Sequence, residues 1–161
     1  MDTLSKWSGR LIIDWPKPEV GWFKWAANSA FRVHAITEDS VLVMDVPRWN
    51  EISLTCETLP ICPVKWQDAL KQWRGVYYIF DRERRMGYVG AAYGNENIWH
   101  RWMTHTKKGG DAKKLKQCDA RNFVFTILER TSPDIEARDI VTLEGNWKSR
   151  LHTIEYGLND N

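Results

Sequence analysis

Two uncharged segments separated by a short charged stretch constrain the fold most. Residues 76–80 are apolar or aromatic throughout, and residues 88–92 carry no charge. Between them, residues 81–86 contain five charged side chains. Apolar runs of this length that flank a polar turn are typical of buried strands. The sequence therefore predicts a β-hairpin at the centre of the chain.

The segments around this hairpin alternate between helical and extended patterns. We expect helices over 63–74, 96–108 and 135–152, and a strand over 122–128. In the second helix Ile98, Trp102 and His105 fall on one side, and Ser132 or Asp134 is a plausible cap for the last helix. The order β-β-α-β-α predicts an α/β fold with a small, mainly antiparallel three-stranded sheet flanked by helices.

The first part of the chain has a different character. Residues 10–15, 31–36 and 41–46 are expected to be short strands, so residues 1–62 form a small β-rich region and residues 63–161 a second domain. Seven of the ten tryptophans precede Gly75: Trp7, Trp15, Trp22, Trp25, Trp49, Trp66 and Trp73. Their rings could stack on bases or fill the core of a small unit. The region could recognise DNA, mediate dimerisation or brace the sheet.

Charge is unevenly distributed along the chain. The net charge is only +2, but the window from Arg82 to Arg121 contains ten basic and four acidic residues. A basic stripe on a nearly neutral protein indicates one contact face for an anion, although many such stripes are only solvated surface.

Cysteine content and hydrophobicity indicate where in the cell the protein is found. The chain has three cysteines, Cys56, Cys62 and Cys118, and their spacing is not that of a zinc site. The simplest interpretation is that all three are buried thiols in a reducing cytosol. We see neither an apolar stretch long enough to span a membrane nor a secretory signal at the N-terminus. A cytoplasmic protein without a membrane partner is the expectation.

One carboxylate lies inside an apolar stripe. Ile140, Leu143, Trp147 and Leu151 define the expected inner face of the last helix, and Glu144 falls among them. Burying an unpartnered carboxylate costs several kcal/mol. Glu144 therefore needs a metal or a basic partner. The alternatives are a structural salt bridge or a helix rotated so that Glu144 reaches its edge.

Two further patterns could carry chemistry. Arg101 and His105 are four residues apart on a helix, so both could reach one phosphate. Alone, they could equally be a surface arginine and a half-buried histidine. Tyr77 and Tyr88 lie in the predicted hairpin, where a tyrosine is commonly part of the core. A catalytic tyrosine would need its pKa lowered by nearby positive charge.

Taken together, these residues resemble the GIY-YIG nucleases. The first signature tripeptide appears as Gly75-Val76-Tyr77, and the second as Tyr88-Val89-Gly90. The arginine of the family's helix matches Arg101, its metal-binding glutamate matches Glu144, and a C-terminal asparagine matches Asn159. The resemblance covers residues 75–161, and His105 is similar to a histidine of the restriction-endonuclease branch.

The resemblance implies a role for each matched residue. Glu144 would hold one Mg²⁺ or Mn²⁺, and Tyr77 would accept the proton of the attacking water. Arg101 would bind phosphate and lower the pKa of Tyr77. His105 would orient Tyr77 or relay its proton, Tyr88 would help to position phosphate, and Asn159 would brace the site. The backbone of double-stranded DNA would be contacted by a basic segment made of Lys107, Lys108, Lys113, Lys114 and Lys116.

The expected activity is metal-dependent hydrolysis of DNA phosphodiester bonds, with sequence specificity of the restriction kind. Double-strand cleavage would need a homodimer or two successive nicks. One alternative is the same chemistry in another role: a repair or recombination nuclease, a mobile-element endonuclease, or a secreted toxin that cuts DNA non-specifically. The others are an inactive nucleic-acid-binding module and a protein-interaction domain built on the tryptophan-rich region.

Overall fold

The computed structural model describes residues 9–15, 27, 30–37, 45–108 and 112–160. The chain divides into two compact units, Met1–Asp45 and Val46–Asn161. Each is considered by itself.

The first unit contains a two-stranded antiparallel sheet. Strand β1 (Leu11–Asp14) pairs with β2 (Arg32–Ile36), which agrees with two of the three predicted strands. Trp15 stacks on Phe31 with ring centroids 5.3 Å apart, yet half of its surface is exposed. Most of the predicted strand 41–46, together with Trp7, Trp22 and Trp25, lies outside the described residues.

The second unit is built on a four-stranded antiparallel sheet. The strand order is β3-β6-β4-β5, with β3 (Ser53–Thr55), β4 (Arg74–Asp81), β5 (Met86–Ala92) and β6 (Phe123–Thr131). The predicted hairpin is β4 and β5. Strand β3 is an addition to the predicted three-stranded sheet. Because it pairs with β6, the compact unit begins at Val46, ahead of the predicted boundary at residue 63.

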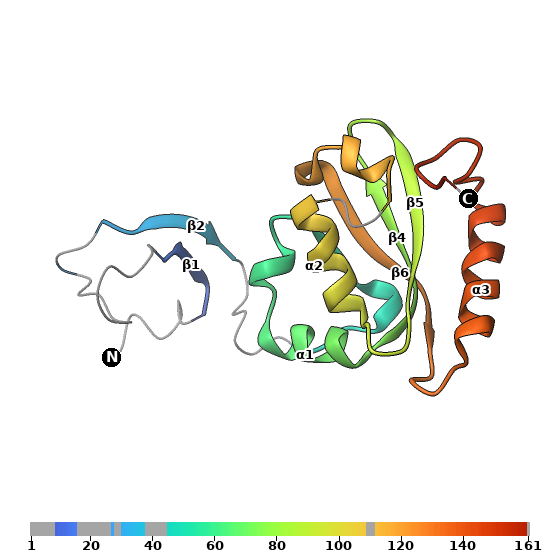
Figure 1. Ribbon diagram of the computed structural model, residues 1–161. Helices are drawn as coiled ribbons and strands as arrows, with labels where there is room; N and C mark the ends of the chain where they lie inside the picture. The colour runs from blue at the N-terminus through green and yellow to red at the C-terminus, as the bar shows by residue number, and fades with distance from the viewer. Residues whose placement is uncertain (1–8, 16–26, 28–29, 38–44, 109–111, 161) are drawn as a thin grey trace. The chain divides into compact units, whose positions relative to one another are not determined.

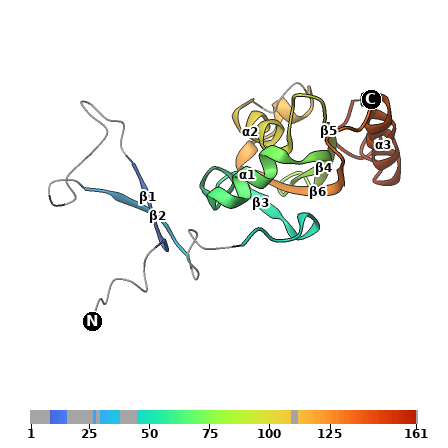
Figure 2. The ribbon, with the colours of Figure 1, turned by 90° about the horizontal axis from the view of Figure 1, so that it is seen from below.

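Helices cover both faces of this sheet. Helices α1 (Val64–Gln72) and α2 (Ile98–Lys108) lie on one face, and α3 (Ala137–Arg150) lies on the other (Figures 1 and 2). Short 3₁₀ turns are η3 (Trp49–Glu51), η4 (Leu59–Ile61), η5 (Leu115–Gln117) and η6 (Ala120–Asn122). Within the described part of the chain, no helix combines the length and apolar character needed to cross a bilayer.

Each face of the sheet has its own core, because side chains alternate along a strand. Tyr77 and Ile79 of β4 pack with Leu70 and Trp102 on the side of α1 and α2. Val76 and the β5 residues Val89 and Ala91 pack with Ile140 of α3 on the other side. Successive residues of one strand therefore serve different helical layers.

Helix α3 begins at Ala137, a few residues after the start that was predicted from Ser132 or Asp134 as its cap. Its N-cap is Glu136, and the Ser132 hydroxyl accepts a hydrogen bond from the Asp134 amide at 3.4 Å instead. The prediction that Ser132 or Asp134 caps this helix is wrong, because Ser132 closes a local turn before it. The helix also ends at Arg150, so Leu151 lies beyond it and is exposed.

Gly75 starts the strand that carries Tyr77. Its φ is 149°, and a Cβ there would collide with the backbone oxygen of Glu129 on β6. Directly after it, the pairing of β4 with β6 shifts register between Val76 and Tyr77. Only glycine adopts the backbone conformation of Gly75 without strain. The register shift determines which residues of β6 lie opposite Tyr77.

The three cysteines are free thiols. Only Cys62 is buried as predicted, whereas Cys56 and Cys118 are half-buried. Burial raises the pKa of the Cys62 and Cys118 thiols to about 11, so both are protonated near neutral pH.

Candidate active site

Three of the predicted site residues meet beneath helix α2. The Tyr77 hydroxyl lies 2.8 Å from His105 Nε2, and both side chains are buried. Arg101 Nε donates to the same hydroxyl at 3.3 Å. Arg101 and His105 thus lie on one face of α2, as their spacing predicts, and the group that they share is a phenol oxygen.

Arg101 has a second partner that the sequence did not reveal. Its Nη1 lies 3.2 Å from Glu96 Oε2, just before α2 begins. The arginine side chain is 21 % exposed, so part of the guanidinium remains within reach of solvent. A group that is fixed on one side by Tyr77 and Glu96 and open on the other is well suited to bind a phosphate.

The protonation of Tyr77 differs from the expectation. Burial raises its pKa above the ordinary value, and nearby Tyr88 adds to the rise. Arg101 acts in the opposite direction, as predicted, but does not offset the loss of hydration. The effect of Arg101 thus has the predicted direction, but the pKa of Tyr77 stays above its ordinary value, and Tyr77 is a neutral phenol.

The glycine of the second tripeptide makes room for this phenol. Gly90 stands opposite Tyr77 in the hairpin register. A Cβ at Gly90 would lie 2.5 Å from the Tyr77 hydroxyl oxygen, which is closer than real Cβ atoms approach. The two tripeptides are thus one packing unit, with a glycine on one strand facing the tyrosine of the other.

Tyr88 connects this cluster to a neighbouring cleft. Its ring meets that of His105 edge-on, with centroids 5.5 Å apart. It also borders a cleft of about 600 Å³ between α3 and the C-terminal segment. The lining residues are Tyr88, Ala112, Lys113, Val141, Glu144, Lys148, Asn159 and Asp160. Three predicted catalytic residues, Tyr88, Glu144 and Asn159, therefore share one cavity with the predicted DNA contact Lys113.

Glu144 reaches the edge of its apolar stripe. Its side chain is 17 % exposed and forms a salt bridge of 3.1 Å with Lys148 one turn later. Both structural explanations considered for this carboxylate therefore hold in part, since it is paired and near the edge. Its negative charge is also close enough to contribute to the raised pKa of Tyr77.

The cleft suits a hard divalent cation. Among the described residues there is no group of three or more His, Cys, Asp or Glu side chains that could enclose a metal. Glu144 and Asp160 are the carboxylates that line the cleft. Mg²⁺ is commonly bound by one or two carboxylates, with waters and substrate phosphates completing its shell. The donor set and the open volume fit that pattern.

Asn159 braces the edge strand of the sheet. Its side-chain Oδ1 accepts from the Val89 amide at 2.9 Å, and its Nδ2 donates to the Val89 carbonyl at 2.8 Å. The buried amide side chain thus satisfies both backbone groups of Val89 on β5, as a further strand would. This geometry agrees with a supporting role beside the cleft.

The predicted DNA-binding lysines differ in location and in the contacts that they make. Lys114 Nζ lies 2.7 to 3.5 Å from the carbonyls of Ile154, Gly157 and Asn159, so it holds the C-terminal segment. Lys113 lines the cleft of Glu144. Lys107 and Lys116 border a second cleft, of about 370 Å³. The side chain of Lys108 lies outside the described part.

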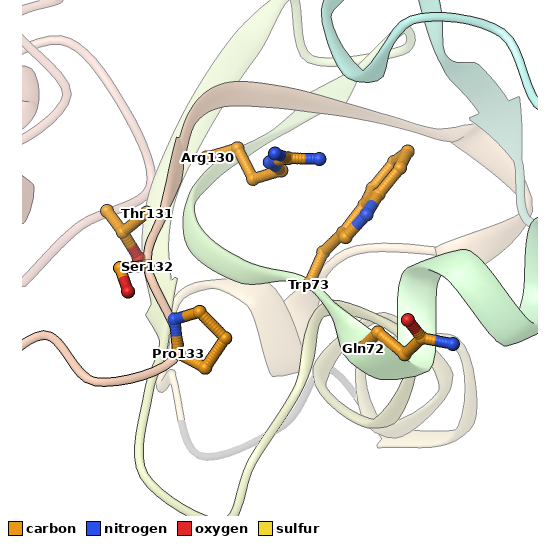
Figure 3. A pocket seen from close by; sticks show the side chains of 6 residues that line it. All are labelled: Gln72, Trp73, Arg130, Thr131, Ser132 and Pro133. Atoms are coloured by element: carbon orange, nitrogen blue, oxygen red, sulfur yellow. The ribbon is translucent and has the colours of Figure 1, made fainter.

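A further cleft, of about 550 Å³, lies where β4 begins and β6 ends. Trp73 and Arg130 point toward one another across it, with the guanidinium carbon 5.6 Å from the indole centroid (Figure 3). None of the predicted site residues lines this cleft. The predicted site residues thus lie elsewhere, in the cluster around Tyr77 and in the cleft of Glu144.

Comparisons with known proteins identify the domain. The family model for the GIY-YIG catalytic domain matches residues 74–157, more than half of the chain. Two solved structures are similar: the catalytic domain of the homing endonuclease I-TevI, at 27 % identity and a TM-score of 0.45, and a point variant of the intron endonuclease I-TevI catalytic domain, at 25 % and 0.46. The similarity covers 55 % of this chain and 98 % and 94 % of those chains, respectively.

No curated protein sequence matches the chain. The assignment rests on the family match over residues 74–157, which runs from the first tripeptide past Glu144. A domain of this family implies nuclease activity on DNA. The chain belongs to the GIY-YIG family and is a GIY-YIG-type endonuclease.

Proposed function

We propose that this protein hydrolyses phosphodiester bonds of double-stranded DNA with one divalent cation, Mg²⁺ or Mn²⁺, held by Glu144. The observation that carries the proposal is the buried contact of Tyr77 with His105 and Arg101, beside the cleft of Glu144. GIY-YIG nucleases generally use divalent metal ions. When bound, such an ion neutralises charge on the phosphate and the leaving oxygen.

The neutral state of Tyr77 determines how it can act. A neutral phenol is a poor base, so it accepts a proton from water only while passing its own proton to a neighbour. His105 Nε2, at 2.8 Å, is in place to receive that proton. Arg101, which donates to the phenol oxygen, stabilises negative charge there and can bind the phosphate. Tyr88, at the border of the cleft, helps to position the phosphate.

Plasmid cleavage tests this function directly. Purified protein should convert supercoiled plasmid in the presence of Mg²⁺ and leave it intact with EDTA. Tyr77→Phe, Arg101→Ala and Glu144→Gln should each lose cleavage while keeping the circular dichroism of the wild type. Glu155→Gln, an exposed change beyond α3, is the matched control and should cleave normally. Absence of EDTA-sensitive cleavage by the wild type would instead indicate a nucleic-acid-binding module.

The products distinguish the finer alternatives. Discrete bands would support sequence-specific cleavage of the restriction or mobile-element kind, whereas a smear would indicate a non-specific nuclease. Nothing among the described residues supports a homodimer, so pairing of two copies stays a prediction. Recognition of DNA by residues 1–62 also stays a prediction, and deleting residues 1–45 while monitoring the band pattern would test it.

A further inference from the structure

The Glu144–Lys148 pair is enclosed more than an ordinary surface pair. The two side chains are 17 % and 16 % exposed. The Arg138–Glu136 pair at the start of the same helix is 79 % and 64 % exposed. Salt screens an enclosed ion pair less than an exposed one, so the electrostatic attraction between the two side chains is stronger.

Among the described residues that line this cleft, positive and negative charges balance when no cation is present. Glu144 and Asp160 contribute two carboxylates, and Lys113 and Lys148 contribute two ammonium groups. A neutral cleft offers little attraction to the polyanionic backbone of DNA. A bound divalent cation would raise the net charge of the cleft to +2. Two phosphate charges of the DNA would then restore neutrality.

The cation and Lys148 compete for the same carboxylate. Lys148 Nζ is 3.1 Å from Glu144 Oε1, on the side chain proposed to bind the cation. A hard divalent ion binds carboxylate oxygen more strongly than an ammonium does. Displaced from Glu144, the half-buried ammonium needs another anion. Asp160 is the other carboxylate of the cleft, where Lys113 offsets its charge. A DNA phosphate is the further anion that the substrate brings.

We propose that Lys148 is a phosphate-binding residue of the catalytic cleft that stays paired with Glu144 until a divalent cation takes over the carboxylate. The proposal rests on the proposed role of Glu144 as cation ligand. It makes cation binding and DNA binding at this cleft mutually reinforcing, because each loosens the pair that opposes the other.

The experiment uses the full chain with Tyr77→Phe, which keeps DNA uncut, and compares it with and without Lys148→Met. Mn²⁺ affinity is measured by paramagnetic resonance in the absence of DNA. Duplex affinity is measured by fluorescence anisotropy with Mg²⁺ and with EDTA. Removing the competing ammonium should tighten Mn²⁺ binding roughly three- to fivefold, as expected for a partly exposed ion pair. Duplex binding should weaken several-fold with Mg²⁺ and barely change with EDTA.

Lys113→Met is the matched control, because it removes the same charge from an exposed position in the same cleft. It should weaken duplex binding similarly with Mg²⁺ and with EDTA, and alter Mn²⁺ affinity less than Lys148→Met does. Equal effects of the two lysine variants on Mn²⁺ affinity, or equal loss of duplex binding by Lys148→Met under both conditions, would overturn the proposal.

Glu144→Gln separates this proposal from the proposed function. Retention of Mn²⁺ binding by Glu144→Gln would show that the cation site is elsewhere. Loss of Mn²⁺ binding there, together with wild-type behaviour of Lys148→Met, would leave the cation site intact and remove only the role of Lys148.

Discussion

Tyr77 and His105 form a hydrogen bond of 2.8 Å in the interior of the second unit, between the central strand β4 and helix α2. Because both side chains are buried and in hydrogen-bond contact, a proton can pass directly between the phenol and the imidazole. The two residues are therefore coupled, since changing either one alters the proton affinity of the other.

Replacing His105 should abolish most of the turnover. Without the imidazole, the phenol proton has no acceptor, and general-base assistance is typically worth about 10²- to 10⁴-fold in rate. His105→Ala should therefore lower kcat by this order and change KM for DNA little. His100→Ala, on an exposed face of the same helix, should keep its rate. Equal activity of the two variants in a plasmid nicking assay would show that His105 is only part of the core.

The stability of the protein should depend on Tyr77 at alkaline pH. An unfolded tyrosine ionises near pH 10, whereas burial raises the pKa of Tyr77 in the folded state. The stabilisation of the neutral phenol is therefore complete below about pH 10 and is lost as the pH rises toward the folded-state pKa. Above about pH 10 the wild type should lose about 1.4 kcal/mol per pH unit relative to Tyr77→Phe, which cannot ionise.

Urea unfolding at about pH 9 and about pH 11 measures this difference. The remaining tyrosines and the thiols titrate in both proteins, so their contributions cancel in the comparison. If the two free energies of unfolding fell in parallel, Tyr77 would have to ionise as readily in the folded protein as in the unfolded chain.

Gly90→Ala should damage the site more than the fold. The added Cβ would lie 2.5 Å from the Tyr77 hydroxyl, so the ring must move away from His105 and Arg101. Overpacking of this kind costs about 1–3 kcal/mol of stability, whereas loss of the proton relay should remove most activity. Thermal unfolding and nicking rates measure the two effects.

Gly145→Ala is the matched control in helix α3. A Cβ there meets nothing within 4 Å, although the residue is next to Glu144. Alanine in place of an exposed helical glycine should stabilise the protein by about 0.5–1 kcal/mol and leave cleavage unchanged. A normal nicking rate for Gly90→Ala would contradict the tight packing of Gly90 on Tyr77.

Lys114 and Lys116 should behave differently although they are two residues apart. Lys114 is occupied by carbonyls of the C-terminal segment, whereas Lys116 is exposed beside a cleft that Lys107 and Arg121 also line. Lys116→Met should reduce the slope of log affinity against log salt by about 1. Lys114→Met should leave that slope unchanged and lower the unfolding free energy. The opposite pattern in anisotropy titrations would restore Lys114 as a DNA contact.

The parts of the fold that could be predicted are those with long, uniform patterns. The hairpin of β4 and β5, helix α2 and strand β6 follow from apolar runs and helical spacing. Strand β3 could not be predicted, because three residues are too few to show a period and its pairing with β6 is a long-range contact. The helix cap was misplaced because Ser132 has the right chemistry for a cap but is used in a turn.

The sequence predicts which site residues lie close together better than it predicts their protonation or their hydrogen-bond partners. The motifs placed Tyr77, Arg101 and His105 together, and the spacing of Glu144 and Lys148 could have indicated their pairing. The raised pKa of Tyr77 could not be foreseen, because it depends on how completely the phenol is buried. The occupation of Lys114 could not either, since its partners are backbone carbonyls some forty residues later.

Tyr77 belongs to the core shared with α1 and α2, whereas Glu144 is carried by α3 on the opposite face of the sheet. The two groups are thus held by helical layers on opposite faces of the sheet. A change that disrupts either layer would displace one of the two groups that the proposed mechanism needs. With the proposed roles of Tyr77 and Glu144, cleavage would therefore require both helical layers to be packed on the sheet at the same time.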